Sequence, residues 1–279
     1  MRWSGVVALG LAAGSQALVP SAVEAGPWAL GRGHVYAKLS YQRLRAERYA
    51  QPDGTVFDIP RFSNDNLDLY VAAGVTDALT LTAGVPLIRS SDLADQPDEL
   101  GRESGFGDLQ MGLEAQLGKR GRFVFGARGV VQVPTGDETV SDGLQAQGSG
   151  VWEGAGLLTV GTSLFGGKGW AQAEAGYQYR GGGLNDGFQY GFQVGWNANG
   201  RAWLSASLRG VEPFSQTPGD VPAGSLTGVG DRTTYVVVGP SLFVRLGAGL
   251  GLQLDLEGAF HTRNLAKGPQ FRAGLTYSR

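Results

Sequence analysis

An alternation of apolar and polar residues with a period of two recurs along most of this chain. Residues 109–117 read LQMGLEAQL, and residues 250–257 read LGLQLDLE. Successive side chains of a β-strand point to opposite faces, so each run predicts a strand with one apolar and one polar face. An amphipathic helix needs an apolar stripe with a period of 3.6 residues, and none of these runs has one. The pattern therefore predicts an all-β chain.

We expect about twelve strands, joined by connections that alternate in length. The expected strands are residues 34–45, 64–75, 78–89, 105–117, 122–133, 151–164, 169–180, 188–197, 201–211, 233–246, 249–261 and 270–278. Tight turns follow the even-numbered strands, whereas longer polar stretches follow most odd-numbered ones. The longer stretches are residues 46–63, 90–104, 134–150, 181–187, 212–232 and 262–269. Short turns at one end and long loops at the other are typical of outer-membrane barrels, whose termini are periplasmic.

A soluble sandwich also has one apolar face per strand, so alternation alone does not choose between a sandwich and a membrane barrel. The aromatic residues favour the barrel, because they gather at both ends of the apolar faces, as at the two interfaces of a bilayer. We therefore predict a transmembrane antiparallel up-and-down β-barrel of about 12 strands. The aromatic residues are Tyr41, Trp152, Tyr177, Tyr179, Phe188 and Tyr190 toward the long loops, and Phe123, Trp196 and Tyr277 toward the short turns.

Residues 1–25 have the pattern of a signal peptide. Arg2 precedes a short apolar run at residues 6–13, and Val23 and Ala25 place small residues at positions −3 and −1 of a cleavage point. The apolar run is shorter than the roughly 20 residues that a membrane-spanning helix needs. We expect cleavage before Gly26, which leaves residues 26–279 as a barrel in the outer membrane of a Gram-negative bacterium.

The polar faces of the expected strands carry charges of both signs. A charge on the lipid face costs about 2–4 kcal/mol at the bilayer centre, so these side chains are expected to line the lumen. Glycines between them, such as Gly195 and Gly251, favour a narrow passage, whereas a salt-bridged interior that only stabilises the barrel is the alternative. The expected lumen residues are Lys38, Asp68, Asp108, Glu114, Arg128, Glu153, Glu174, Arg180, Arg209, Arg245, Asp255 and Glu257.

The composition argues against several chemistries. The chain has no cysteine, which excludes disulfides, thiolate nucleophiles and Cys-ligated zinc, and its net charge of −2 argues against a nucleic-acid partner. His34 and His261 are its two histidines. His261 lies near a strand end, where membrane-embedded lipases place a catalytic histidine, but no matching serine and acid can be assigned. We expect no catalytic residue, no cofactor and no enzyme activity.

Two charged stretches leave a binding role open. An acidic stretch at residues 92–99 could bind a divalent cation, but its spacing lacks the EF-hand pattern, so a solvated loop is favoured and no metal site is predicted. Arg43, Arg45 and Arg48 lie near the top of the first strand. They could contact lipopolysaccharide phosphates, or they could be ordinary surface charges.

Five short motifs resemble the outer-membrane proteins of the putative meta-pathway of phenol degradation family. They are GVTDAL at residues 74–79, VPL at 85–87, GFGDL at 105–109, VPTGD at 133–137 and GSGVWE at 148–153. Two features depart from the pattern: Glu153 stands where an aspartate is expected, and the chain ends on Arg279 rather than on an aromatic residue. The resemblance implies a barrel that moves small hydrophobic or aromatic compounds.

The sequence thus favours an outer-membrane channel or transporter for passive movement of small solutes, hydrophobic or aromatic ones among them. The alternative is a structural or lipid-contacting barrel with a closed lumen. The expected partners are outer-membrane lipids, lipopolysaccharide, a small-molecule solute and, during biogenesis, the barrel-insertion machinery.

Overall fold

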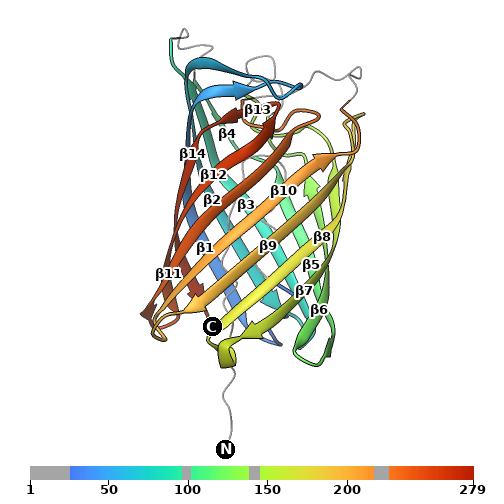
Figure 1. Cartoon of the computed structure of the whole chain (residues 1–279), viewed down its shortest axis with the longest axis vertical. Coiled ribbons are helices and arrows are strands. Elements are labelled where there is room, and N and C mark those ends of the chain that lie inside the picture. Colours follow the sequence, from blue (N-terminus) through green and yellow to red (C-terminus); the bar gives the residue numbers. More distant parts are fainter. Residues whose placement is uncertain (1–25, 96–101, 138–144, 217–225) are drawn as a thin grey trace, which may run out of the picture.

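The alternating stretches of the sequence lie in long antiparallel strands of one sheet. A computed structural model describes residues 26–95, 102–137, 145–216 and 226–279, and these form the closed barrel of Figure 1. The sheet has 14 strands, of which β4 (Arg102–Gly105) and β13 (Leu265–Lys267) are short additions. The wall strands are β1 (Val35–Ala50), β2 (Val56–Gly74), β3 (Leu79–Leu93), β5 (Leu109–Arg120), β6 (Phe123–Val133), β7 (Glu153–Leu164), β8 (Gly169–Arg180), β9 (Gly187–Asn197), β10 (Ala202–Pro213), β11 (Thr234–Gly247), β12 (Leu250–Arg263) and β14 (Pro269–Ser278).

Each wall strand pairs with the wall strands before and after it in the sequence, which is the up-and-down topology. The first and last strands close the ring: Leu39 of β1 lies opposite Leu69 of β2 and opposite Leu275 of β14. The predicted all-β, twelve-stranded barrel is therefore confirmed. Among the described residues, the one helical element is a 3-10 turn, η2 (Phe165–Gly167), and no helix is long and apolar enough to cross a membrane.

The strands extend beyond their predicted ends on the long-loop side. Residues 46–63 were predicted as a loop, but most of them continue the β1–β2 hairpin, with a bulge between Ala46 and Arg48. In the same way β3 continues to Leu93, where it pairs with β4, and β13 pairs with the end of β1. These segments mix apolar and polar residues without regular alternation, so the period-two pattern does not reveal them.

The two faces of the wall differ as predicted. Large apolar side chains such as Leu158, Leu256 and Leu275 are exposed on the outside, where lipid would contact them. Side chains at the alternate positions are buried inside the barrel, and most of these are polar or charged. Eight of the nine predicted interfacial aromatic residues are exposed large side chains; Tyr190 is half-buried against Phe188. The lumen, rather than an apolar core, therefore positions the functional groups of this chain.

Candidate functional site

The interior holds charged side chains of both signs. Asp68 is half-buried, and Arg245 is exposed near the short turns, where its guanidinium lies 4.9 Å from the centre of the Trp203 ring. The other ten predicted lumen residues are buried. They are Lys38, Asp108, Glu114, Arg128, Glu153, Glu174, Arg180, Arg209, Asp255 and Glu257.

One group of charges joins β10, β12 and β14 across the lumen wall. Arg209 Nη2 lies 2.6 Å from Glu257 Oε2, and Arg272 Nη1 lies 3.5 Å from Asp255 Oδ2. Arg272 also donates to Gln42 Oε1 of β1 through Nε at 3.2 Å. An unpaired buried ion costs several kcal/mol, so these alternating signs are what allow the charges to stay inside.

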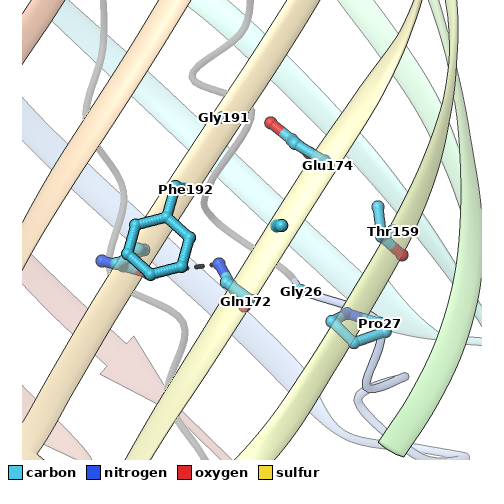
Figure 2. Close-up of a pocket in the computed structure, with 9 residues that line it drawn as sticks. Gly26, Pro27, Thr159, Gln172, Glu174, Gly191 and Phe192 are labelled. Carbon is cyan, nitrogen blue, oxygen red and sulfur yellow. Dashed lines mark hydrogen bonds between the residues drawn. The ribbon is translucent and has the colours of Figure 1, made fainter.

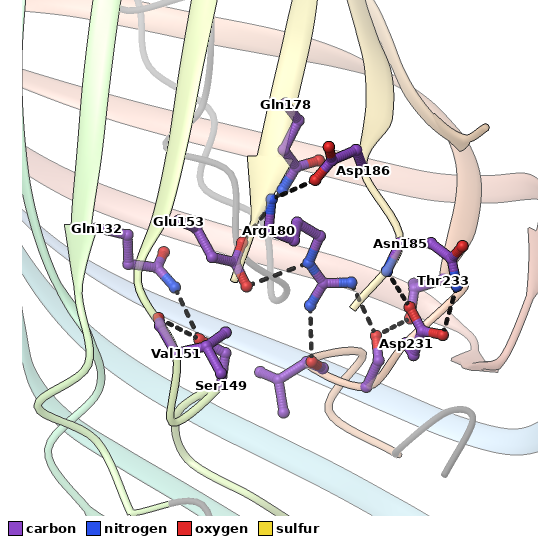
Figure 3. A network of polar contacts seen from close by, with 12 residues as sticks. Gln132, Ser149, Val151, Glu153, Gln178, Arg180, Asn185, Asp186, Asp231 and Thr233 are labelled. Atoms are coloured by element: carbon purple, nitrogen blue, oxygen red, sulfur yellow. Dashed lines mark hydrogen bonds and ion pairs between the residues drawn. The ribbon is translucent and has the colours of Figure 1, made fainter. Parts of the chain in front are cut away.

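A second group anchors a loop inside the barrel. Arg180 Nε donates to Glu153 Oε1 at 3.1 Å, while its two terminal nitrogens donate to the backbone carbonyls of Val229 and Gly230 at 3.0 and 3.2 Å. Figure 3 shows this guanidinium between the wall strands and the loop before β11. Arg180 therefore ties the described part of that loop, residues 226–233, to β7 and β8.

The same loop is held at a second point. Asp231 accepts from the backbone N–H and the side-chain amide of Asn185, both at 2.7 Å, and Figure 3 shows this contact beside Arg180. Asp231 is buried, and Arg232 Nε lies 3.4 Å from its Oδ2 atom. The loop before β11 is thus fixed by ionic groups rather than by strand pairing.

Asp108 anchors the loop after β6. Its Oδ1 atom accepts from the backbone N–H groups of Thr135 and Gly136 at 3.1 and 2.9 Å. Its Oδ2 atom accepts from the N–H of Ser149 at 2.8 Å and from the amide of Gln132 at 3.1 Å. One buried carboxylate, at the start of β5, therefore holds both described ends of this loop.

The two loops meet over the lumen at the long-loop end of the barrel. Thr227 Oγ1 donates to the carbonyl of Ala146 at 2.8 Å. Around this contact two apolar clusters join the loops to the wall. The first contains Ala146, Val211, Val229 and Tyr235, and the second contains Leu44, Ala46, Phe62, Leu93, Leu226 and Ala266. The described residues thus cover this end of the lumen.

A cavity of about 40 Å³ lies in the wall of the long-loop half. Its lining is mostly apolar, and Arg209, Glu257 and Gln270 supply its polar groups. The apolar part consists of Leu44, Tyr235, Val237, Gly258, Ala259, Leu265, Ala266 and Gly268. A lining of this character suits the apolar part of a small molecule.

The cavity borders an interruption in the wall. Pairing between β12 and β14 ends at Gly258 and Pro269, although β12 continues to Arg263. The segment before Pro269 forms β13, which pairs with β1 instead. Proline has no N–H to donate, so the ladder cannot extend through this position.

The short-turn end of the lumen is crossed by residues 26–31, which precede β1. Leu30 N donates to Thr80 Oγ1 of β3 at 3.0 Å. Closer to the start of this segment, Trp28 packs on Gly161 of β7, where an added Cβ would come within 2.4 Å of the Trp28 ring. Because β5 and β6 separate β3 from β7 in the wall, this segment spans the interior.

The glycines of the inner face accommodate neighbouring side chains. A Cβ at Gly195 would come within 2.1 Å of the Trp170 ring, and one at Gly251 within 2.4 Å of the Phe243 ring. The expectation that glycines leave an open passage is therefore wrong at these two positions. A bulky ring fills the space that each glycine leaves.

The remaining candidates lie apart from the lumen. His34 precedes β1, and His261 Nε2 lies 3.5 Å from Glu212 Oε1 at the exposed rim. Asp92 pairs with Arg102 at 3.3 Å, while Asp98 and Glu99 lie outside the described residues. Within the described ranges, no group of three or more His, Cys, Asp or Glu side chains is arranged to hold a metal ion.

The three arginines near the top of the first strand face outward or stand at the rim. Arg43 Nε lies 3.4 Å from Asp65 Oδ1, and Asp65 also accepts from the Tyr41 hydroxyl. Arg45 and Arg48 are exposed. Contact of these residues with lipopolysaccharide phosphates remains a prediction.

Sequence reasoning missed two kinds of residue. Arg272 is buried at the centre of the first charged group, and its position beside the outward-facing Phe271 would have placed it inside by alternation. Asp231 and Arg232 lie in a predicted loop, where no periodicity indicates which side chains turn into the barrel. Only the folded loop reveals their role.

Comparison with known proteins gives one family and several similar folds. A family model described as "Putative MetA-pathway of phenol degradation" matches residues 23–273. A crystal structure of an outer membrane channel from Pseudomonas putida F1 is 18% identical, with a TM-score of 0.70 over 90% of this chain and 97% of that one. A comparison with curated proteins gives no match.

Two further structures share the barrel at lower similarity. The KdgM porin is 6% identical, with a TM-score of 0.52 over 86% of this chain and 98% of that one. The translocator domain of the autotransporter NalP from Neisseria meningitidis is 13% identical, with a TM-score of 0.50 over 88% of each chain. Because a porin and a translocator both resemble this barrel, these similarities describe the fold alone.

Proposed function

The chain belongs to the family described as "Putative MetA-pathway of phenol degradation", and from this premise we propose that it is an outer-membrane channel for passive movement of small solutes, hydrophobic or aromatic compounds among them. A solved channel and a porin have a similar barrel, so this fold is compatible with a channel. In the proposal, residues 1–25 direct export and are removed.

The observation that carries this proposal is the apolar cavity beneath the inward-folded loops. Ligand sites are commonly clefts with apolar walls and a few polar groups, and the lining of this cavity has that character. It lies beside the point where β12 and β14 separate. An apolar solute there would contact the apolar lining beside the Arg209–Glu257 pair.

The charged interior supports weak ionic selectivity. Pores that select strongly by charge are ringed by side chains of one sign. Here arginines and carboxylates alternate around the wall, as in the Arg209–Glu257 and Arg180–Glu153 pairs. We propose that the charges keep the lumen polar and folded, while the apolar cavity distinguishes among solutes.

The coverings at the two ends suit a conduit that opens. At the long-loop end the cover consists of loop segments held by a few polar anchors, chiefly Asp108 and Arg180. Release of those anchors moves loops and leaves the strand ladder unbroken. The wall of the barrel can therefore persist while the lumen opens.

The segments across the lumen favour a second candidate function, that of a structural or lipid-contacting barrel. Described segments cross both ends of the lumen, and buried ion pairs such as Arg272–Asp255 lie on its wall. A structural or lipid-contacting barrel needs no more than this. The two candidates differ in whether the apolar cavity binds a solute.

Neighbouring valines of β11 provide a matched test of solute binding. Val237 lines the cavity, whereas Val238 is exposed on the outer face. Fluorobenzene should bind the purified protein, as measured by ¹⁹F NMR in detergent. Val237→Trp should weaken this binding about tenfold or more by filling the cavity, and Val238→Trp should leave it unchanged.

Two outcomes of the fluorobenzene experiment would contradict the proposal. Equal fluorobenzene affinity in wild type, Val237→Trp and Val238→Trp, with all three proteins folded, would mean that the cavity is not the binding site. Absence of binding in all three would favour the structural barrel.

A further inference from the structure

One buried carboxylate of the lumen makes no ion pair with the described residues, whereas Glu114, Glu153, Asp255 and Glu257 each make at least one. Glu174 of β8 is nine-tenths buried, and its Oε1 atom has no hydrogen-bond partner among the described residues. The nearby Arg128 guanidinium lies 4.0 Å from Glu114 Oε1 on its other side. A buried carboxylate is costly unless it is paired, so the site calls for another cation.

Glu174 lines a cavity that also contains the start of the described chain. The cavity is small, about 10 Å³, and Gly26, Pro27, Thr159 and Gln172 line it with Glu174. Figure 2 shows Gly26 and Pro27 beside Gln172 and Thr159, with Glu174 two residues farther along β8 on the same face. Gly26 and Glu174 therefore border the same small space.

The segment that carries Gly26 is closely fitted to the inner wall. A Cβ at Gly126 would come within 3.0 Å of the Pro27 backbone, and a Cβ at Gly161 within 2.4 Å of the Trp28 ring. At Gly26 itself, a Cβ would come within 1.9 Å of Gln172 Oε1. Small residues on both sides of the contact thus determine where this segment lies.

We propose that the α-ammonium group of a chain cleaved before Gly26 is the cation that binds Glu174 in this cavity. Hydrolysis of the Ala25–Gly26 peptide bond by a signal peptidase consumes one water and leaves a carboxylate on Ala25 and an amine on Gly26. The amine takes up a proton at neutral pH. Export processing thereby completes the segment that crosses the short-turn end of the lumen.

The acceptors of the cavity match an ammonium group. An ammonium has three N–H donors and no acceptor. Gln172 uses its amide nitrogen to donate to Gln193 Oε1 at 3.1 Å, so its carbonyl oxygen is turned toward Gly26. Glu174, this carbonyl and the Thr159 hydroxyl provide oxygen atoms on the walls of one cavity.

The pairing has a structural consequence. Residues 26–31 precede the first strand, and hydrogen bonds such as Leu30 to Thr80 tie their far end to the barrel. An ionic contact at Gly26 fastens the second end on β8. The precursor has an uncharged peptide nitrogen at this position and therefore cannot make the contact.

Acylation of the α-amine tests the proposal on the mature protein. Acetic anhydride reacts with the neutral amine, and a carboxylate within about 4–6 Å favours the charged form by one or more pKa units. The Gly26 amine of wild type should therefore be acetylated about tenfold more slowly than that of Glu174→Gln, as measured by mass spectrometry of the N-terminal peptide. Glu257→Gln is the matched control, because Glu257 is a buried lumen carboxylate outside this cavity.

A second variant guards against misfolding of Glu174→Gln. A chain with one extra alanine before Gly26 moves the ammonium by roughly 3.5 Å and should also be acetylated at the faster rate. Equal rates in wild type and in whichever of these two variants folds would overturn the proposal. A mature chain that begins at a residue other than Gly26 would overturn it as well.

Discussion

Individual side chains of the lumen have distinct structural roles. Arg180 joins a loop to the wall, Asp108 fastens another loop, and Arg272 balances the carboxylates of β12. Alternation alone placed most of these residues inside, because a charge on the lipid face is too costly. It did not indicate their partners, which lie up to 230 positions away, as Gln42 does from Arg272.

Arg128→Glu tests whether the interior tolerates a change of sign. In wild type this buried arginine lies between Glu114 and Glu174, so the variant places three carboxylates together. Loss of a buried pair costs about 3–5 kcal/mol. The folded barrel should lose its resistance to detergent at a lower temperature, as seen in the heat-modifiable shift on a gel. An unchanged transition, with altered ion selectivity, would indicate a wide aqueous lumen at this level.

The sequence predicts the strands of the wall better than it predicts the irregular segments. All twelve wall strands were predicted, because apolar and polar faces alternate along them, but β1, β2 and β3 extend beyond their predicted ends on the long-loop side. The inward course of residues 226–233 and 26–31 was not predicted, because it depends on contacts with distant strands. Long-range contacts of irregular segments leave no period in the sequence.

The orientation of these elements can be tested by cysteine labelling, since the natural chain has no cysteine. Asp53 lies in the turn between β1 and β2 at the long-loop end, and Lys119 lies at the short-turn end of β5. An impermeant maleimide should label Asp53→Cys in intact cells and should leave Lys119→Cys unlabelled. Disrupted cells should label both. The reverse pattern would mean that the short turns face outward.

Two glycines of β7 test the segment that crosses the lumen. Gly161 contacts Trp28, whereas an added Cβ at Gly156 would meet nothing within 4 Å. Gly161→Ala should displace the segment and raise the rate at which a protease that cleaves after aromatic residues cuts beside Trp28. The protease should cut Gly156→Ala at the wild-type rate. Equal cleavage in both variants would argue that this contact does not hold the segment in place.

At the scale of the whole molecule, the barrel has a polar interior, and parts of its own chain lie across both ends. The wall is closed by strand pairing, and the coverings are fastened by side chains. The coverings can therefore move without unfolding the wall, as the proposed channel requires. A structural barrel of the same shape would gain nothing from an apolar cavity beneath its loops.

Single-channel current in planar bilayers tests this account most directly. The test protein lacks residues 26–32 and carries Arg180→Met with Glu153→Gln, which removes the short-turn covering and the Arg180 anchor of the loop before β11 and leaves no unpaired charge at that anchor. The control carries the same truncation with Arg209→Met and Glu257→Gln, a buried pair outside the loop anchors. The account predicts the largest and longest current steps in the test protein, smaller steps in the control and the smallest in wild type. A folded, heat-modifiable test protein without current would contradict it.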